Sequence, residues 1–392
     1  MAALDGIRVL DAGLLVHGPQ AAAMLGDWGA DVIKVELPAF GDQARWLPMG
    51  PDDSRSAVFV ACNRGKRSVT VDLRVAEGRE VFLRLAETAD VVISNFKPGT
   101  MDAWRLGYQD VAARNPRVVY AAGSAFGDVG RDAGREGADL SGQAAGGLIS
   151  TTGVDGGEPT PVGTTIADHI ASQNLASGIL AALLARERSG RGQRVATSLV
   201  GGQIWAQAPE YTGFLLSGRE PGRANRGNAQ LPGLYGIFPT ADGWVAVVGV
   251  TAAVRTSFYA AIGRPELAER FPQPLYWSSV KRQLFPILDE VFSTRSTAEW
   301  CQVLDAAGVR YAPVRNHAEV VADPGVWDNG YLTTVEGPSG QVTVVPAPVQ
   351  FSDTPARPSG IAPELGQHTE EVLLEIGYSW DDISHLRDIG AI

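Results

Sequence analysis

The sequence has few residues of the kinds that build metal sites and disulfides. Its 392 residues include two cysteines, Cys62 and Cys301, and five histidines. Neither cysteine is part of a CxxC pair and no HExxH spacing occurs, so a zinc site or a Cys–His nucleophile is poorly supported. Two separated thiols in a large chain indicate a reducing compartment and no disulfide framework. We therefore expect no metal site.

Long apolar runs and an excess of positive charge are also missing. No stretch approaches about 18 uninterrupted apolar residues, the length that suggests a membrane-spanning helix. The first residues, MAALDGIRVLDAG, lack the charged start and long apolar run of a signal peptide. The net charge of −11 is opposite to the basic balance typical of nucleic-acid-binding proteins, although a few local Arg and Lys can still hold an anion. We expect a cytoplasmic protein that binds neither membranes nor nucleic acid.

The first third of the chain alternates strand-like and helical patterns. Strands are predicted at residues 7–11, 31–36, 68–72, 90–94 and 118–122, and helices at 19–28 and 76–88. This alternation predicts a parallel sheet covered on both faces, a Rossmann-like α/β fold. No GxGxxG motif follows the first strand, where DAGLLVHGP stands, and no Walker A motif occurs. Dinucleotide binding is therefore weakly supported.

The later part of the chain changes in composition. Helices are predicted at residues 165–188 and 195–216, then a linker rich in Gly, Pro, Arg and Asn at 218–233. A strand at 243–250 follows, with helices near 252–262, 279–292 and 297–307, which indicates a second, smaller α+β domain. A Pro-rich loop at 337–360 precedes helices near 370–376 and 380–388.

Asp168 stands out in the first turns of the helix predicted over 165–188. Apolar residues share its face of that helix, namely Ala171, Leu175, Ile179 and Ala182. The helix dipole favours an ionised carboxylate there, whereas burial disfavours it. An ionised, poorly hydrated carboxylate suits nucleophilic catalysis. A helix cap explains the same position, and the residues alone leave both explanations open.

A series of segments in register resembles a known family. They are LDGIRVLDAG, LGDWGADVIKVE, GDQAR, NRGKRSVTVDL, ADVVISNFKPGTMDAWRLG, NPRVVYAAGSAFG, QAAGGLISTTG, the Asp168 helix with SGRGQRVATSL, GNAQLPGLYGIFPTADGWVAV, AGVRYAPV with DPGVWDNGYL, and LGQHTEEVLLEIGYSWDDISHL. Over nearly the whole chain they are similar to the family III CoA-transferases, which include formyl-CoA transferase, carnitine CoA-transferases and 2-methylacyl-CoA racemases.

The resemblance implies a domain plan and an assembly. A large Rossmann-like, CoA-binding domain is expected from both chain ends, residues 1–200 and 338–392. A small α+β domain is expected over 225–320, with linkers at 201–224 and 321–337. The resemblance also implies a homodimer whose two chains are interlinked.

The resemblance further implies the chemistry. Asp168 matches the catalytic aspartate, whose carboxylate attacks the donor thioester to give a mixed anhydride and then an aspartyl-CoA thioester. The partners implied are an acyl-CoA donor and a carboxylic acid acceptor. Coenzyme A is then a substrate, and no permanently bound cofactor is implied. Backbone N–H groups of the glycine turns before Asp168 would stabilise the oxyanions.

A set of residues matches CoA-contacting positions of the family. They are Val16 and His17 near the thioester, Asn95 and Phe96 in a turn, the basic Arg74, Lys97 and Arg105, the contact residue Val71, and the acidic Asp139. Taken singly, each basic residue is equally explained as a solvated surface charge, and Phe96 as core packing.

Two departures from the family pattern narrow the function. Ala138 stands where the racemases have a His, and alanine cannot exchange a proton, which favours a transferase. Val16 replaces a Gln of formyl-CoA transferase, and GNAQLPGLYG replaces its run of four glycines, which disfavours oxalate and formyl-CoA. A 2-methylacyl-CoA racemase or epimerase and a non-catalytic CoA-ester-binding protein remain as alternatives. The donor and acceptor acids stay open.

Overall fold

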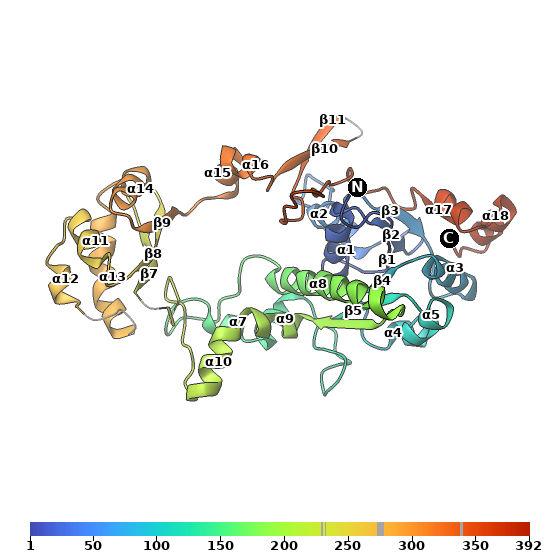
Figure 1. The fold of residues 1–392 in the computed structure, drawn as a ribbon, viewed down its shortest axis with the longest axis horizontal. Coiled ribbons are helices and arrows are strands. Elements are labelled where there is room, and N and C mark those ends of the chain that lie inside the picture. The colour runs from blue at the N-terminus through green and yellow to red at the C-terminus, as the bar shows by residue number, and fades with distance from the viewer. Residues whose placement is uncertain (229, 232, 273–277, 338–339) are drawn as a thin grey trace. The chain divides into compact units, whose positions relative to one another are not determined.

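The chain folds into two compact units. The computed structural model describes residues 1–228, 230–231, 233–272, 278–337 and 340–392. The larger unit comprises Met1–Gly146, Thr164–Ala206 and Pro324–Ile392, and the smaller comprises Gly147–Gly163 and Gln207–Asp323 (Figure 1). The predicted ranges put residues 147–163 in the large domain. These residues instead pack in the smaller unit, because the N–H groups of Ala224 and Asn225 donate to the carbonyls of Thr151 and Gly153.

A six-stranded parallel sheet organises the larger unit. Its order is β3-β2-β1-β4-β5-β6, and every adjacent pair is parallel. The strands are β1 (Arg8–Asp11), β2 (Asp31–Glu36), β3 (Arg67–Thr70), β4 (Val91–Ser94), β5 (Val119–Ser124) and β6 (Arg194–Ser198). This confirms the predicted α/β class. The strand order reverses between β1 and β4, so the loops after these two strands flank the crevice where such folds bind ligands.

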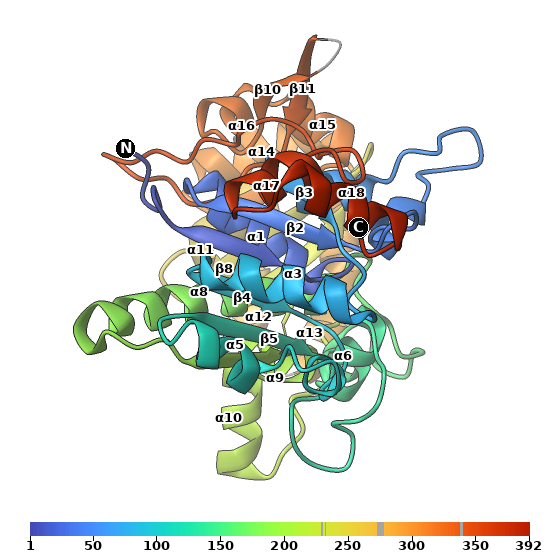
Figure 2. The same ribbon diagram turned by 90° about the vertical axis from the view of Figure 1, so that its right-hand side faces the viewer.

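Helices cover both faces of this sheet, as the buried strands require. Val91 and Ile93 of β4 face a core shared with α1 (His17–Asp27) and α8 (Ile166–Ser189), which pack on each other. Val92 faces the opposite core, which is completed by α3 (Ala76–Glu87), α5 (Tyr108–Arg114), α17 (Thr369–Glu375) and α18 (Trp380–Asp388). Figure 2 shows α3 and α17 on the near side of the sheet.

The helix predicted over 195–216 is wrong at its start and in its continuity. Residues 195–216 form the end of strand β6, then α9 (Leu199–Ala206) and α10 (Ala208–Ser217). The run RVATS pairs with β5 from Tyr120 to Ser124, and this long-range pairing overrides the apolar helical pattern that follows it directly. The predicted loop at 337–360 contains one strand of a hairpin, β10 (Thr333–Gly337) with β11 (Gly340–Val344).

Short elements connect the sheet of the larger unit. They are η1 (Gln43–Trp46), α2 (Ala57–Asn63), α4 (Thr100–Ala103), α6 (Asp139–Ala145) and α16 (Pro324–Asp328). In the described part of the chain, no helix combines the length and apolar character that a bilayer crossing needs.

The smaller unit has its own antiparallel sheet and core. Strands β7 (Leu234–Pro239), β8 (Trp244–Val250) and β9 (Arg310–Pro313) pair in that order. Its helices are α7 (Leu148–Thr151), α10, α11 (Arg255–Ala261), α12 (Leu267–Arg270), α13 (Ser278–Phe292), α14 (Thr297–Ala306) and α15 (His317–Ala322). The Phe292 ring stacks on Phe238 at a centroid distance of 5.2 Å and lies 4.8 Å from Trp300, so aromatic contacts join the sheet to α13 and α14.

Candidate active site

The loops after β1 and β4 meet at the crevice of the sheet. The Leu14 N–H donates to Oδ1 of Asn95 at 2.7 Å, and Nδ2 of Asn95 donates to the Leu14 carbonyl at 2.9 Å. The predicted CoA contact Asn95 therefore lies beside the loop that carries Val16 and His17. Its amide group is engaged by the backbone of that loop.

His17 is a buried, neutral imidazole at the start of α1. Only 3% of the residue is exposed, and its Nε2 lies 2.9 Å from Oγ1 of Thr197. Gly123 leaves room for the ring, since a Cβ there would lie 2.8 Å from Nδ1. Burial lowers the pKa of His17 to about 4, against a smaller opposing effect of a hydrogen bond with the Ala171 backbone. Val16, the preceding residue, is buried as well.

Three of the predicted CoA-binding residues share one cavity. Val71, Arg74 and Phe96 line a space of about 230 Å³ together with Leu14 and Trp104. The Phe96 ring meets Trp104 edge-on at 5.3 Å, and the guanidinium of Arg74, 63% exposed, pairs with Asp72 at 2.7 Å. The cavity is lined by apolar side chains, which suit a nucleotide base, and also by Glu36 and Asp72, the second of which pairs with Arg74. Leu14 and Trp104 had no distinguishing signal in the sequence.

The other two basic residues lie apart from this cavity. Lys97 lines a neighbouring space of about 240 Å³ with Tyr108 and Arg194. Arg105 is exposed, adopts a φ of 57°, and lines neither of these two cavities. The structure thus gathers Val71, Arg74 and Phe96 but not Arg105.

Asp139 caps the helix that carries Asp168. Its Oδ1 accepts from the N–H groups of Ala167 and Asp168 at 2.7 and 3.2 Å. Its Oδ2 accepts from Nε2 of Gln143 at 2.6 Å, and the same Nε2 lies 3.3 Å from the carbonyl of Thr164. Asp168 therefore does not cap its own helix. Gln143 was not singled out in the sequence, although its i,i+4 spacing from Asp139 on α6 was a usable signal.

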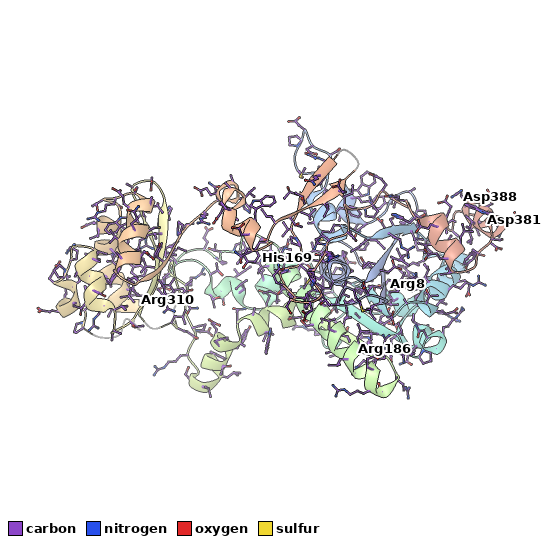
Figure 3. The ribbon with its side chains drawn as sticks, turned by 45° about the horizontal axis from the view of Figure 1, so that its top comes forward. Arg8, His169, Arg186, Arg310, Asp381 and Asp388 are labelled. Carbon is purple, nitrogen blue, oxygen red and sulfur yellow. The ribbon has the colours of Figure 1, made fainter. Side chains whose placement is uncertain are left out.

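The Asp168 carboxylate is basic and poorly solvated. Burial first, and the negative charge of Asp139 second, raise its pKa from 3.8 to about 7. Among the described residues, none donates a hydrogen bond to this carboxylate. Both ring nitrogens of the neighbouring His169 have other partners, Gln20 and Thr165. Figure 3 shows His169 at the start of α8, at the opposite end from Arg186. A desolvated carboxylate of raised basicity is suited to attack a carbonyl carbon.

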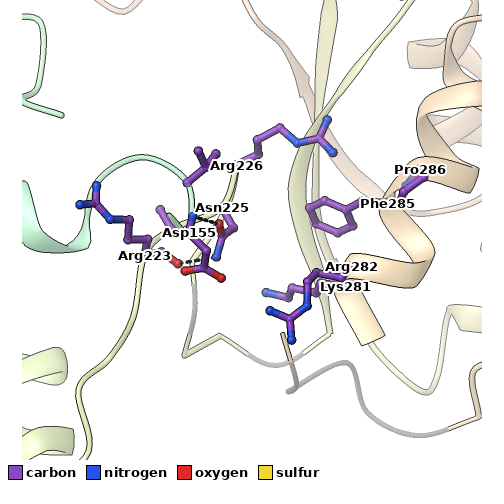
Figure 4. Close-up of a pocket in the computed structure, with 10 residues that line it drawn as sticks. Asp155, Arg223, Asn225, Arg226, Lys281, Arg282, Phe285 and Pro286 are labelled. Atoms are coloured by element: carbon purple, nitrogen blue, oxygen red, sulfur yellow. Dashed lines mark hydrogen bonds between the residues drawn. The ribbon is translucent and has the colours of Figure 1, made fainter. Parts of the chain in front are cut away.

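The smaller unit has a separate cavity of about 330 Å³, shown in Figure 4. Four cations line it, and three of them have hydrogen-bond or ion-pair partners within the unit. Nη1 of Arg223 donates to the Thr152 carbonyl at 2.7 Å, Arg226 pairs with Asp289 at 2.9 Å, and Nζ of Lys281 donates to the Asn228 carbonyl at 2.9 Å. These contacts give three of the four cations a structural role.

Comparison with known proteins decides the family. The sequence model of CoA-transferase family III matches residues 4–369. The chain belongs to CoA-transferase family III. The predicted resemblance and the predicted enzyme class, a CoA-transferase acting between acids, are thereby confirmed.

Members of the family with known activity or structure are similar over nearly their full length. The succinyl-CoA:mesaconate CoA-transferase of Haloarcula hispanica is 35% identical over 96% of this chain and 97% of its own. The human succinyl-CoA:glutarate CoA-transferase is 30% identical over 99% and 90%. The crystal structure of a CaiB/BaiF family protein from Brucella suis superposes with a TM-score of 0.84 at 32% identity, covering 96% of this chain and 99% of the other.

Proposed function

We propose that this family III enzyme transfers CoA from succinyl-CoA to a second small carboxylic acid through covalent intermediates on Asp168. The observation that carries the proposal is the Asp168 carboxylate, which is largely buried, has no donor among the described residues and lies beside the charge of Asp139. The names of similar enzymes support the donor, since they specify succinyl-CoA with mesaconate or glutarate as acceptor.

In the proposed first half-reaction, the ionised Asp168 attacks the thioester carbonyl carbon. The C–S bond breaks, CoA leaves as a thiolate, and an aspartyl–succinyl anhydride remains. The thiolate then attacks the aspartyl carbonyl and releases succinate, which leaves an aspartyl-CoA thioester. The acceptor carboxylate reverses these steps. Each step exchanges one activated acyl group for another, so no bound cofactor is needed.

The environment of Asp168 favours acylation. Forming the anhydride or the thioester removes the negative charge of Asp168 from beside Asp139. The repulsion that raises the pKa of Asp168 is therefore relieved in the covalent intermediates. The raised basicity also makes the carboxylate a stronger nucleophile once it is ionised.

The CoA nucleotide is assigned in this proposal to the cavity lined by Val71, Arg74 and Phe96. The exposed Arg74 would face a phosphate, and the two apolar side chains would face the base. The family resemblance further supports an interlinked homodimer whose CoA-binding domain combines both chain ends. Sedimentation velocity tests this part, because a monomer would exclude it.

Trapping the covalent intermediate tests the function. Intact-mass spectrometry after incubation with succinyl-CoA should show a CoA-sized adduct that hydroxylamine removes. Asp168→Asn and Asp168→Ala should show none, whereas the exposed Asp388→Asn should react like the wild type. No wild-type adduct, together with exchange of the α-proton of a 2-methylacyl-CoA in deuterated water, would identify a racemase instead. CoA binding without either reaction would identify a non-catalytic protein.

A further inference from the structure

Four buried charged side chains lie beneath the loop that follows β1. This anchor cluster comprises Asp11, Lys34, Asp42 and Lys66, each at most 3% exposed. Nζ of Lys34 lies 2.8 Å from Oδ2 of Asp42 and 3.8 Å from Oδ2 of Asp11, and Nζ of Lys66 lies 2.7 Å from the same Asp11 oxygen. Two buried cations thus balance two buried anions.

The anchor cluster and Asn95 together bind the backbone of the loop. Oδ1 of Asp11 accepts from the Gly13 N–H at 2.8 Å, Nζ of Lys34 donates to the Gly13 carbonyl at 2.7 Å, and Oδ1 of Asp42 accepts from the Leu15 N–H at 3.0 Å. The two Asn95 contacts satisfy Leu14. Each polar backbone group from the Gly13 N–H to the Leu15 N–H therefore has a side-chain partner.

The held conformation is one that the loop would not keep by itself. Leu15 has a φ of 61°, in the left-handed region that a branched, non-glycine residue rarely occupies. Such a backbone conformation is strained and persists where its surroundings enforce it. The enforcing groups here are Asp42, on the Leu15 N–H, and Asn95, on the preceding residue.

Stability alone does not account for the anchor cluster. Replacing a buried ion pair by apolar side chains of similar volume is often neutral or stabilising, whereas removing one partner is strongly destabilising. What the charges supply is fixed hydrogen-bond directions toward the loop. Leu14 of this loop lines the same cavity as Val71 and Phe96.

We propose that Lys34 and Asp42 are positioning residues that hold residues 13–15 in the shape that receives the CoA ester. The inference rests on the proposed function through the assignment of CoA to that cavity. Neither side chain touches the substrate. They keep the wall of the cavity formed before the substrate arrives, so their loss lowers the fraction of enzyme that is competent to bind.

Three variants separate positioning from stability. Lys34→Met leaves the buried Asp42 carboxylate without its cation, so we expect a lower Tm and a raised KM for succinyl-CoA. The double variant Lys34→Met/Asp42→Leu removes both charges, so it should regain part of the Tm that Lys34→Met loses, while the Gly13 carbonyl and the Leu15 N–H stay without their side-chain partners. Its KM should stay at least about tenfold raised, because a loop in the competent shape one-tenth of the time weakens binding by that factor. Asp42→Ala removes the acceptor of the Leu15 N–H and should raise KM as well.

Arg186→Met is the matched control. Arg186 is 3% exposed and pairs with Asp90 at 2.9 Å, at the end of α8 opposite Asp168. It should lower Tm and leave KM unchanged.

The result that overturns the proposal is a double variant whose KM returns to the wild-type value as its Tm recovers. If the double variant does not fold, a wild-type KM in Asp42→Ala overturns it equally, because alanine has no acceptor for the Leu15 N–H. Failure of the proposed function is distinguishable. At saturating succinyl-CoA, adduct formation on Asp168 does not depend on the anchor cluster, so it tests the proposed function by itself. The affinity for free CoA, measured by calorimetry, reports the conformation of the loop even where no adduct forms.

Discussion

Replacing Asp168 by Asn should stabilise the folded protein at alkaline pH while it abolishes transfer. The pKa of Asp168 rises from 3.8 in an ordinary environment to about 7 in the fold, mainly through burial. Above about pH 7 the folded state therefore carries an unfavourable charge, and below about pH 4 the carboxyl is protonated in both states and the penalty vanishes. A shift of about three pKa units corresponds to at most ~4 kcal/mol. At roughly 2 °C per kcal/mol for a domain of this size, the upper bound is about 8 °C.

Differential scanning calorimetry of the whole protein at about pH 8 and about pH 4.5 measures this effect. The gain in Tm of Asp168→Asn over the wild type should be large at the higher pH and small at the lower. Asp388→Asn, at an exposed site, should change little at either pH. An equal gain at both pH values would refute the reasoning, because the effect would then not come from ionisation.

Four further predictions concern the same site. Asp139→Asn removes one of the two causes of the raised pKa of Asp168, so the acid limb of the pH profile of kcat/KM should move to lower pH, and a fixed limb would contradict the coupling. The lowered pKa of His17 keeps its ring neutral, so its NMR signals should not titrate between about pH 5.5 and 8. Arg74→Gln should raise KM for the CoA ester by about tenfold with little change in kcat, and an unchanged KM would remove Arg74 from the phosphate site. Gly123→Ala places a Cβ 2.7 Å from Cε1 of His17 and should destabilise the fold by about 1–3 kcal/mol in denaturant titrations, whereas a neutral effect would show that the ring can move.

The periodic parts of the fold could be predicted from local sequence. The strands at the centre of the sheet are short β-branched runs between turn signals, and the bounds of β2 agree with the prediction. Strand β6 could not be predicted, since its five residues become a strand only by pairing with β5, some 70 residues earlier in the chain. The left-handed Leu15 carried no local signal either, because groups far along the sequence impose it.

Part of the candidate site could likewise be predicted from local sequence, and part could not. The apolar stripe of the long helix correctly placed Asp168 on an inward face, since Ala171 and Leu175 are fully buried. The cap on that helix could not be foreseen, because Asp139 lies 29 residues before Asp168 and reaches it only in the folded chain. Contacts of this kind shift the pKa of Asp168, whose charge state the sequence pattern alone left open.

The free edge of the outer strand β3 is hydrogen-bonded by residues that are synthesised long after it. Oγ1 of Thr369 accepts from the Thr70 N–H at 3.0 Å, and Nδ1 of His368 accepts from the Ser68 N–H at 3.2 Å. The Ala391 carbonyl accepts from the Asp72 N–H just beyond the strand at 2.8 Å. During synthesis, the edge of this strand therefore stays unpaired, and open to pairing with other chains, until about 300 further residues have emerged from the ribosome. Synthesis of that length takes roughly 15 to 60 s at bacterial and eukaryotic rates. Chaperone occupancy during synthesis should end when these residues dock, and early termination near residue 360 should yield aggregates rather than a folded fragment.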